Sequence, residues 1–245
     1  MAKEGLKFLH WAYFSLEENE SKETIIDRCI DLAYVDATNQ GSFNTRADNT
    51  DKNPVARGHV YEYIIEKNIR DYDIWHENLC DQLLIDYSAV RKKKVKAGED
   101  PAAFTYGNAQ KWVNMTVKYL FIYRSSLDSF GGGCSVDFCN FYDEKFAPHQ
   151  SSFHVPIDSF IMQAIWPQNS VEGECDWLPG AKFIRKNHPY LGEYNPFHYT
   201  PWSKFIKSEY MRVRDHVRTL VSASGKAPLE WENEEWVRVA KIRKS

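Results

Sequence analysis

Two lysines and an asparagine share one face of an apolar helical segment near the middle of the chain. In the stretch from Phe104 to Tyr123, a helical repeat of about 100° per residue aligns Lys111, Asn114 and Lys118. We expect Lys111 on the first exposed turn of this helix. An amine held in a cleft loses its water of hydration, which favours the neutral form, and a neutral lysine is a nucleophile.

A carboxylate and a histidine precede a second apolar helix, within Phe153-His-Val-Pro-Ile-Asp158-Ser-Phe-Ile-Met. Asp158 stands where the free N–H groups of a helix start stabilise an ionised carboxylate. It could therefore stabilise a developing positive charge or assist proton transfer. Proline followed by aspartate is also an ordinary helix start, and that alternative remains open. His154 could contact a phosphate or a bound nucleotide, or serve only as a structural hydrogen-bond partner.

Helical periodicity dominates the rest of the chain. Apolar residues at i, i+3 and i+4 predict amphipathic helices over Thr24–Ala37, Arg57–Asn68, Tyr72–Tyr87 and Gly107–Arg124. Further helices are predicted over Pro156–Trp166, Thr200–Ser222 and Pro228–Ile242. Ser125–Ser152, which contains three consecutive glycines, is interpreted as an inserted loop. The sequence therefore predicts an all-α protein, with residues 1–245 forming one mostly helical unit.

Composition excludes several classes of protein. The 245 residues are 43% hydrophobic and 15% aromatic, which excludes a chain that is disordered throughout. We expect no membrane association, because no stretch is long and apolar enough to span a bilayer. The start of the chain has no apolar region typical of a signal peptide. The five cysteines do not have the spacing of a zinc site, so we expect no bound metal. An odd number of cysteines without a signal peptide indicates free thiols, so we expect a cytoplasmic protein.

The chain resembles the helix–hairpin–helix DNA glycosylases in three features. These are Gly107, Lys111 four residues later in a helix, and Pro156-Ile-Asp158 at the start of the next helix. The similarity covers about residues 104–166 and is closest to the 8-oxoguanine glycosylase branch. The segments AQKWVNMTVKYL and HVPIDSFI are also similar to bacterial proteins related to phage-defence glycosylases that remove glucosylated hydroxymethylcytosine. The resemblance implies two helical lobes around a cleft.

By this resemblance, Lys111 is the nucleophile that attacks the sugar C1′, and Asp158 assists the proton transfers and stabilises the sugar cation. Gly107 matches the first hairpin glycine, which grips DNA phosphate through its backbone. Lys118 matches a position that also carries lysine in the archaeal type. No cofactor is implied, because the iron–sulfur cysteines of another branch are missing. The function implied is excision of an oxidised purine or a modified cytosine, with or without abasic-site lyase activity.

The chain departs from the family at two places. Ala109 replaces the second hairpin glycine, which weakens the predicted grip on phosphate. The connection from Lys111 to Asp158 is longer than usual, which is why Ser125–Ser152 is interpreted as an insertion. These departures keep open an alternative, in which the chain is a catalytically inactive module that binds DNA or protein.

The expected partner is double-stranded DNA with one base flipped out of the stack. The basic run around Lys92, Lys93 and Lys94 is a candidate for phosphate contacts, or else a solvated loop. Gln110 and Asn114 flank Lys111 and could hydrogen-bond the edge of a base. The net charge of -3 does not favour a nucleic-acid binder, but local clustering of cations outweighs the sum. We expect a monomer.

Overall fold

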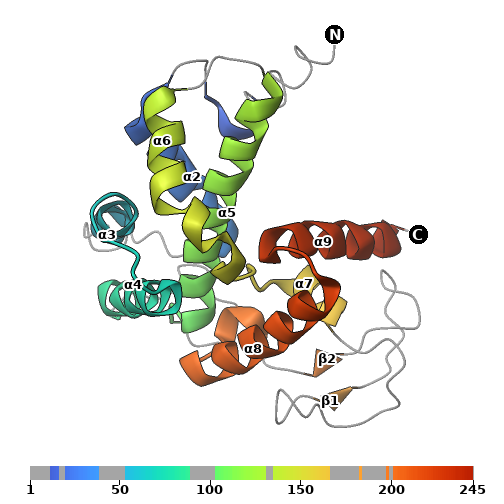
Figure 1. The fold of residues 1–245 in the computed structure, drawn as a ribbon. Helices are drawn as coiled ribbons and strands as arrows, with labels where there is room; N and C mark the ends of the chain where they lie inside the picture. Colours follow the sequence, from blue (N-terminus) through green and yellow to red (C-terminus); the bar gives the residue numbers. More distant parts are fainter. Residues whose placement is uncertain are drawn as a thin grey trace. The chain divides into compact units, whose positions relative to one another are not determined.

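The protein, seen in a computed structural model, is built of helices (Figure 1). Two strands of two residues each, β1 (Lys182–Phe183) and β2 (Phe197–His198), form an antiparallel pair. The all-α prediction is therefore confirmed. The structure describes residues 12–16, 20–38, 53–88, 103–130, 135–165, 182–183, 197–198 and 201–244.

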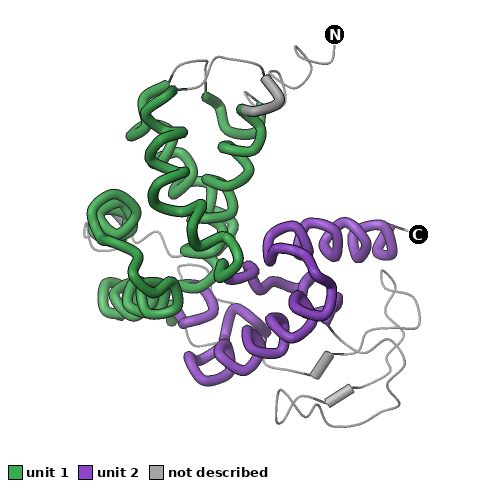
Figure 2. Tube along the Cα trace, in the orientation of Figure 1, with its two compact units in different colours: residues 1–104, 109–153 green, residues 105–108, 154–245 purple. Residues whose placement is uncertain are grey.

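The chain divides into two compact units (Figure 2). Unit 1 comprises Met1–Phe104 and Ala109–Phe153, and unit 2 comprises Thr105–Asn108 and His154–Ser245. The first turn of the longest helix is thus assigned to unit 2 and the remainder of it to unit 1. The predicted arrangement of two lobes around a cleft stays a prediction.

Unit 1 contains most of the long helix α5 (Tyr106–Phe130) and four other helices. They are α2 (Lys22–Ala37), α3 (Asn53–Ile65), α4 (Tyr72–Asp86) and α6 (Val136–Lys145). Short polar side chains fix where they begin: Ser21 Oγ accepts a hydrogen bond from the Thr24 N–H at 3.1 Å, and Asp71 caps α4 in the same way. The Trp112 indole packs against the Tyr34 ring in a tilted arrangement and donates to the Ile30 carbonyl, which joins α5 to α2.

The prediction of a loop over Ser125–Ser152 is wrong. Helix α5 continues to Phe130, α6 follows, and a 3₁₀ helix, η1, spans Ala147–Ser152. Phe138, Tyr142 and Phe146 are spaced four residues apart and are all buried, so they anchor the segment to the core of unit 1. The three consecutive glycines favour a loop, whereas the spacing of these buried aromatic residues is that of a helix.

Unit 2 contains α7 (Ser159–Ile165), the 3₁₀ helix η2 (Trp202–Lys204), α8 (Lys207–Ser224) and α9 (Pro228–Lys244). Helix α8 ends at Gly225, whose φ of 70° is a left-handed conformation suited to glycine. Helix α9 begins at a proline with Glu230 in its first turn and ends in Lys241, Arg243 and Lys244, so its charges oppose the helix dipole at both ends.

Helix α7 is held on α9 by an aromatic and cationic stack. The Phe160 ring lies 4.4 Å from the Trp236 ring, and the Arg243 guanidinium carbon lies 3.9 Å from the Phe160 ring centroid. Arg243 also donates to the Ser159 carbonyl at 2.8 Å and to the Gln163 side chain at 2.9 Å. These contacts position the start of α7, which carries Asp158.

The expectation of five free thiols is corrected. Cys29 and Cys80 are free and buried, whereas Cys139 is disulfide-bonded. The cysteines therefore give no argument for a reducing compartment.

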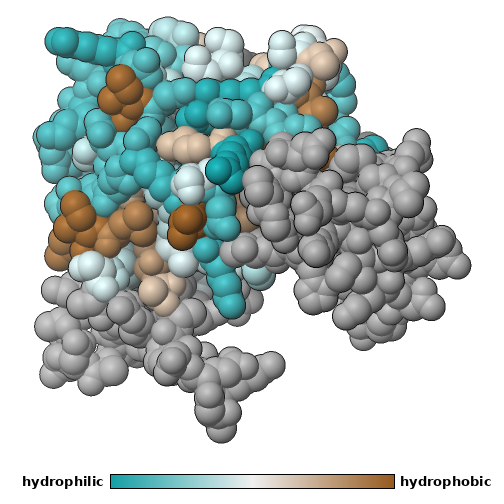
Figure 3. Space-filling model, turned by 90° about the horizontal axis from the view of Figure 1, so that it is seen from below, coloured by the Kyte–Doolittle hydropathy of each residue, from teal (hydrophilic) through white to brown (hydrophobic). Residues whose placement is uncertain are grey.

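Across the described parts of the chain, no helix has the length and apolar character needed to cross a membrane. The face in Figure 3 is mostly hydrophilic where its residues are described, and its apolar side chains form small separate groups. Single exposed apolar residues, such as Ile74 and Ile85, are ordinary on the surfaces of folded proteins.

Gly107 provides a sharp test of the start of α5. A Cβ atom at this position would lie 1.8 Å from the Trp202 carbonyl oxygen, so a backbone segment would have to move. We expect Gly107→Ala to lower the free energy of unfolding by about 3 kcal/mol. Gly58→Ala in α3, where a Cβ meets nothing within 4 Å, should instead raise it by about 0.5–1 kcal/mol. Urea unfolding of both variants measures the difference, and equal stabilities would refute the close approach.

Candidate functional site

Lys111 lies in the second turn of α5 and is buried, with 5% of its surface exposed. The expectation of an exposed turn is therefore wrong, because every residue from 106 to 117 is buried. Lys118, seven residues later on the same stripe, is half-buried. The lysine stripe thus begins in the interior and ends at partial contact with solvent.

The two amides beside Lys111 are bonded to each other. Gln110 and Asn114 are both fully buried, and the Asn114 side-chain N–H donates to the Gln110 side-chain oxygen at 3.0 Å. This pairing is the i, i+4 contact that a helix favours between such side chains. To hydrogen-bond the edge of a base, as the sequence predicts, the two side chains would have to exchange this bond for a new one.

Asp158 caps helix α7. Its Oδ1 accepts hydrogen bonds from the Phe160 N–H at 2.9 Å and the Ile161 N–H at 3.0 Å, and the side chain is half-buried. The helix-start interpretation is thus confirmed, and the same bonds stabilise the ionised carboxylate. Lys111 belongs to unit 1 and Asp158 to unit 2, and their approach to one another stays a prediction.

His154 is buried in unit 2, and both of its ring nitrogens are engaged. Nδ1 lies 2.8 Å from the Tyr210 hydroxyl, and Nε2 lies 3.0 Å from the Arg218 guanidinium. Because a guanidinium only donates, Nε2 must accept. His154 is therefore a neutral imidazole whose Nδ1–H donates to Tyr210. These contacts favour the structural interpretation over a direct contact with a phosphate.

Gly107 does not offer its backbone to a phosphate in this structure. It is buried, its N–H donates to the Phe205 carbonyl at 3.0 Å, and the Trp202 carbonyl packs against its Cα. The predicted DNA contact through this N–H is therefore corrected, since a protein carbonyl already takes the donor. The other predicted DNA-binding residues, Lys92, Lys93 and Lys94, lie outside the described residues.

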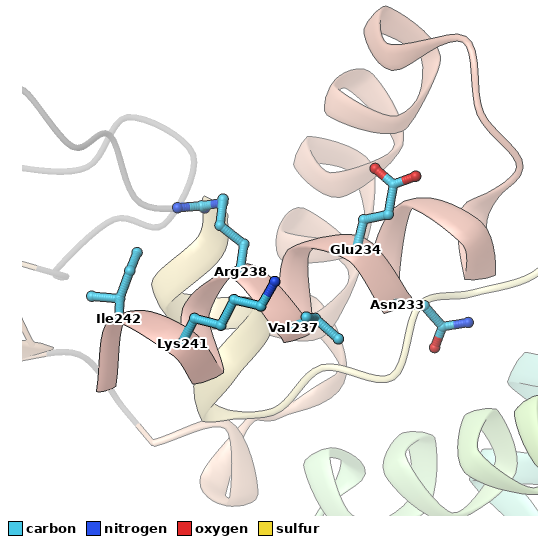
Figure 4. Close-up of a pocket in the computed structure, with 6 residues that line it drawn as sticks. All are labelled: Asn233, Glu234, Val237, Arg238, Lys241 and Ile242. Carbon is cyan, nitrogen blue, oxygen red and sulfur yellow. The ribbon is translucent and has the colours of Figure 1, made fainter. Parts of the chain in front are cut away.

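A surface hollow runs along α9 (Figure 4). The described residues that line it come from one stripe of that helix, and the predicted catalytic residues are not among them. Glu234 pairs with Lys226, and Arg238 pairs with Glu235, so two of its charges are matched locally. The lining residues are Asn233, Glu234, Val237, Arg238, Lys241 and Ile242.

Comparisons with protein-family models, with curated proteins and with solved structures find no match for this chain. The resemblance to glycosylases therefore depends on the quoted residues alone.

Sequence reasoning missed Tyr210 and Arg218, the partners of His154. They follow it by 56 and 64 residues and lie two turns apart on α8. In the sequence, Tyr210 and Arg218 lie on one side of an amphipathic helix, but this spacing does not indicate that they contact His154.

Two substitutions of Asp158 distinguish its role as a helix cap from the role of its negative charge. Asparagine also accepts hydrogen bonds at a helix start, so Asp158→Asn should keep the wild-type stability within about 0.5 kcal/mol. Asp158→Ala leaves the Phe160 and Ile161 N–H groups without the carboxylate and should cost about 1 kcal/mol. Thermal and denaturant unfolding of the two variants test this, and equal losses would contradict the cap.

Tyr210→Phe should cost about 1–3 kcal/mol, because it removes the acceptor of the buried His154 Nδ1–H. Tyr142→Phe is the matched control. Tyr142 is equally buried, but its hydroxyl accepts only a long hydrogen bond of 3.4 Å from the half-buried Gln150. Chemical denaturation should show the larger loss for Tyr210→Phe, and a larger loss for Tyr142→Phe would contradict a buried hydrogen bond between Tyr210 and His154.

Proposed function

We propose that the protein is a DNA glycosylase in which Lys111 is the nucleophile and Asp158 the helper carboxylate. The observation that carries the proposal is the burial of Lys111 beside two buried amides on α5. A lysine amine is a nucleophile that can attack carbon and form a covalent intermediate. Lysine is rarely buried in a protein interior, so the position of Lys111 among buried side chains supports a chemical role.

In the proposed reaction the Lys111 amine attacks C1′ of the target nucleotide. The bond from C1′ to the base breaks, and the base leaves with the bonding electrons and takes a proton. Loss of the amine proton and opening of the sugar ring then give an imine between Lys111 and C1′, which water hydrolyses or which permits strand cleavage. All of these steps use groups of the chain, the DNA and water.

Asp158 would act through its charge. Two backbone N–H groups stabilise the ionised carboxylate, so it can balance the positive charge that develops on the sugar as the base departs. It can also accept the proton that the attacking amine releases. The cap thereby supplies a carboxylate in a fixed orientation without further reorganisation.

The substrate would be duplex DNA with the target base flipped out, at a cost of a few kcal/mol. The base is an oxidised purine or a modified, glucosylated cytosine, which places the enzyme in DNA repair or in defence against phage. Lys118 is half-buried on the same stripe and is the candidate for a phosphate contact near the reacting sugar.

A second function, a non-catalytic helical module that binds DNA or protein, is favoured by two observations. The Gly107 N–H is used inside the protein, and Ala109, in place of a second glycine, is fully buried. Such a module would not need a buried lysine at position 111.

Borohydride trapping on the full chain tests the proposal. Wild type, Lys111→Gln and the control Lys241→Gln, at an exposed lysine on α9, are incubated with undamaged, abasic, 8-oxoguanine-containing and glucosylated phage DNA. We expect a covalent adduct with one damaged or modified DNA that wild type and Lys241→Gln form and Lys111→Gln does not. Asp158→Asn, which retains the cap, should lower base release by at least about 100-fold.

Circular dichroism confirms that each variant is folded. Abasic sites without an adduct would indicate that water, not Lys111, attacks the sugar. An adduct that survives in folded Lys111→Gln would refute this nucleophile. Neither adducts nor abasic sites on any DNA would favour the binding module.

A further inference from the structure

Three flat groups are stacked where helix α7 meets helix α9 in unit 2. The Phe160 and Trp236 rings have centroids 4.4 Å apart, and their planes are inclined by 23°. The Arg243 guanidinium carbon lies 3.9 Å from the centroid of Phe160. An indole and a guanidinium cannot occupy the same face of one ring at these distances, so Phe160 lies between them. The indole of Trp236 therefore forms one end of the stack.

The face of the indole that points away from Phe160 is open. Trp236 has 37% of its surface exposed. Phe160 covers one face, so the exposed surface belongs to the opposite face and the edge of the indole. Among the described residues, no second ring stacks on Trp236. Its neighbours one turn away on α9 are Ala240, which has only a methyl group, and the half-buried Asn233. Another flat group can therefore extend the stack.

The chemistry of this surface favours a nucleobase. Aromatic rings prefer offset parallel stacking, and Phe160 already holds the indole in one orientation. Every nucleobase has a π-face, and bases stack on aromatic side chains with little dependence on sequence. Lys244 is an exposed cation two turns after Trp236 in α9, and a cation there attracts the phosphates of a nucleic-acid strand. A flat ring on an anionic strand therefore fits both features.

The stack is joined to the helix start that carries Asp158. The Phe160 N–H donates to Asp158 Oδ1 at 2.9 Å, so the ring beneath Trp236 and the proposed helper carboxylate are held by the same turn. Arg243 fixes this turn from the other side through the Ser159 carbonyl. A base on Trp236 would consequently lie on a surface whose position is coupled to that of the carboxylate.

We propose that Trp236 is a stacking platform for an unpaired nucleobase of DNA, which lies on the indole face away from Phe160. A base inside a duplex has both faces covered by its neighbours, so only a base taken out of the stack can reach the platform. Asn233 supplies an amide donor and acceptor beside this face for the edge of the base. The proposal rests on the proposed function, because a glycosylase is what takes a base out of the duplex.

Two single strands of equal length and charge separate stacking from electrostatic attraction. One is oligothymidylate, and the other consists of tetrahydrofuran residues, which have no base and cannot form an imine. Fluorescence anisotropy of the labelled strands measures their affinity for the full chain. We expect wild type to bind oligothymidylate about tenfold more tightly than the strand without bases, because stacking contributes to the first alone.

Three variants at the platform and beside it test the cause. Trp236→Leu keeps an apolar cover on Phe160 but has no π-face, and it should lose the preference for oligothymidylate. Trp236→Phe keeps a ring and should retain most of the preference. Val237→Ala is the matched control, since Val237 is equally exposed on α9 but 100° further round the helix, and it should behave as wild type. Circular dichroism checks that each variant is folded.

The results separate the platform from the glycosylase reaction. Equal affinity of wild type for both strands, or an unchanged preference in folded Trp236→Leu, overturns the platform even if Lys111 forms an adduct in the trapping experiment. A preference that depends on Trp236 supports the platform. If no DNA then gives adducts or abasic sites, the platform stands in a protein that binds unpaired bases without excising them.

Discussion

The burial of the first half of helix α5 on all sides is the constraint on which the rest of the structure depends. Every side chain from Tyr106 to Val117 is in the interior, although five of them are polar or charged. A buried polar group is tolerated only with partners, and the helix supplies several itself. Asn114 bonds Gln110 one turn earlier, and the Thr116 hydroxyl bonds the Trp112 carbonyl. Lys111 is the one lysine, arginine or acidic residue in this stretch.

The chemistry proposed for the protein uses groups that already have structural tasks. Asp158 caps α7 by accepting hydrogen bonds from two backbone N–H groups at the start of that helix. Arg243 stacks on Phe160 and holds the following turn, so the carboxylate has a fixed base. His154, by contrast, is fully occupied by Tyr210 and Arg218 and serves the packing of unit 2.

The charged side chains of the two units are placed differently. Unit 2 separates its charges along α9, with acids at the start and cations at the end, in keeping with the helix dipole. Unit 1 packs aromatic rings between its helices and rests the stem of Lys145 on one of them, where burial lowers the pKa of the amine. Lys111 and Lys145 are therefore two lysines of unit 1 with reduced contact with water. Lys111 is buried, whereas Lys145 is half-buried.

The sequence by itself determined the helices and several of their ends. The sequence predicts a helix over Tyr72–Tyr87, and α4 spans Tyr72–Asp86. The prediction is accurate here because apolar periodicity and the Asp71 cap are local signals. It failed over residues 125–152, where the spacing of Phe138 and Tyr142 was less conspicuous than a glycine run. Tertiary structure alone decided that Lys111 is buried, that Gly107 faces the Trp202 carbonyl, and that His154 meets Tyr210. These partners lie tens of residues apart, and no local pattern encodes which distant groups will share an interior.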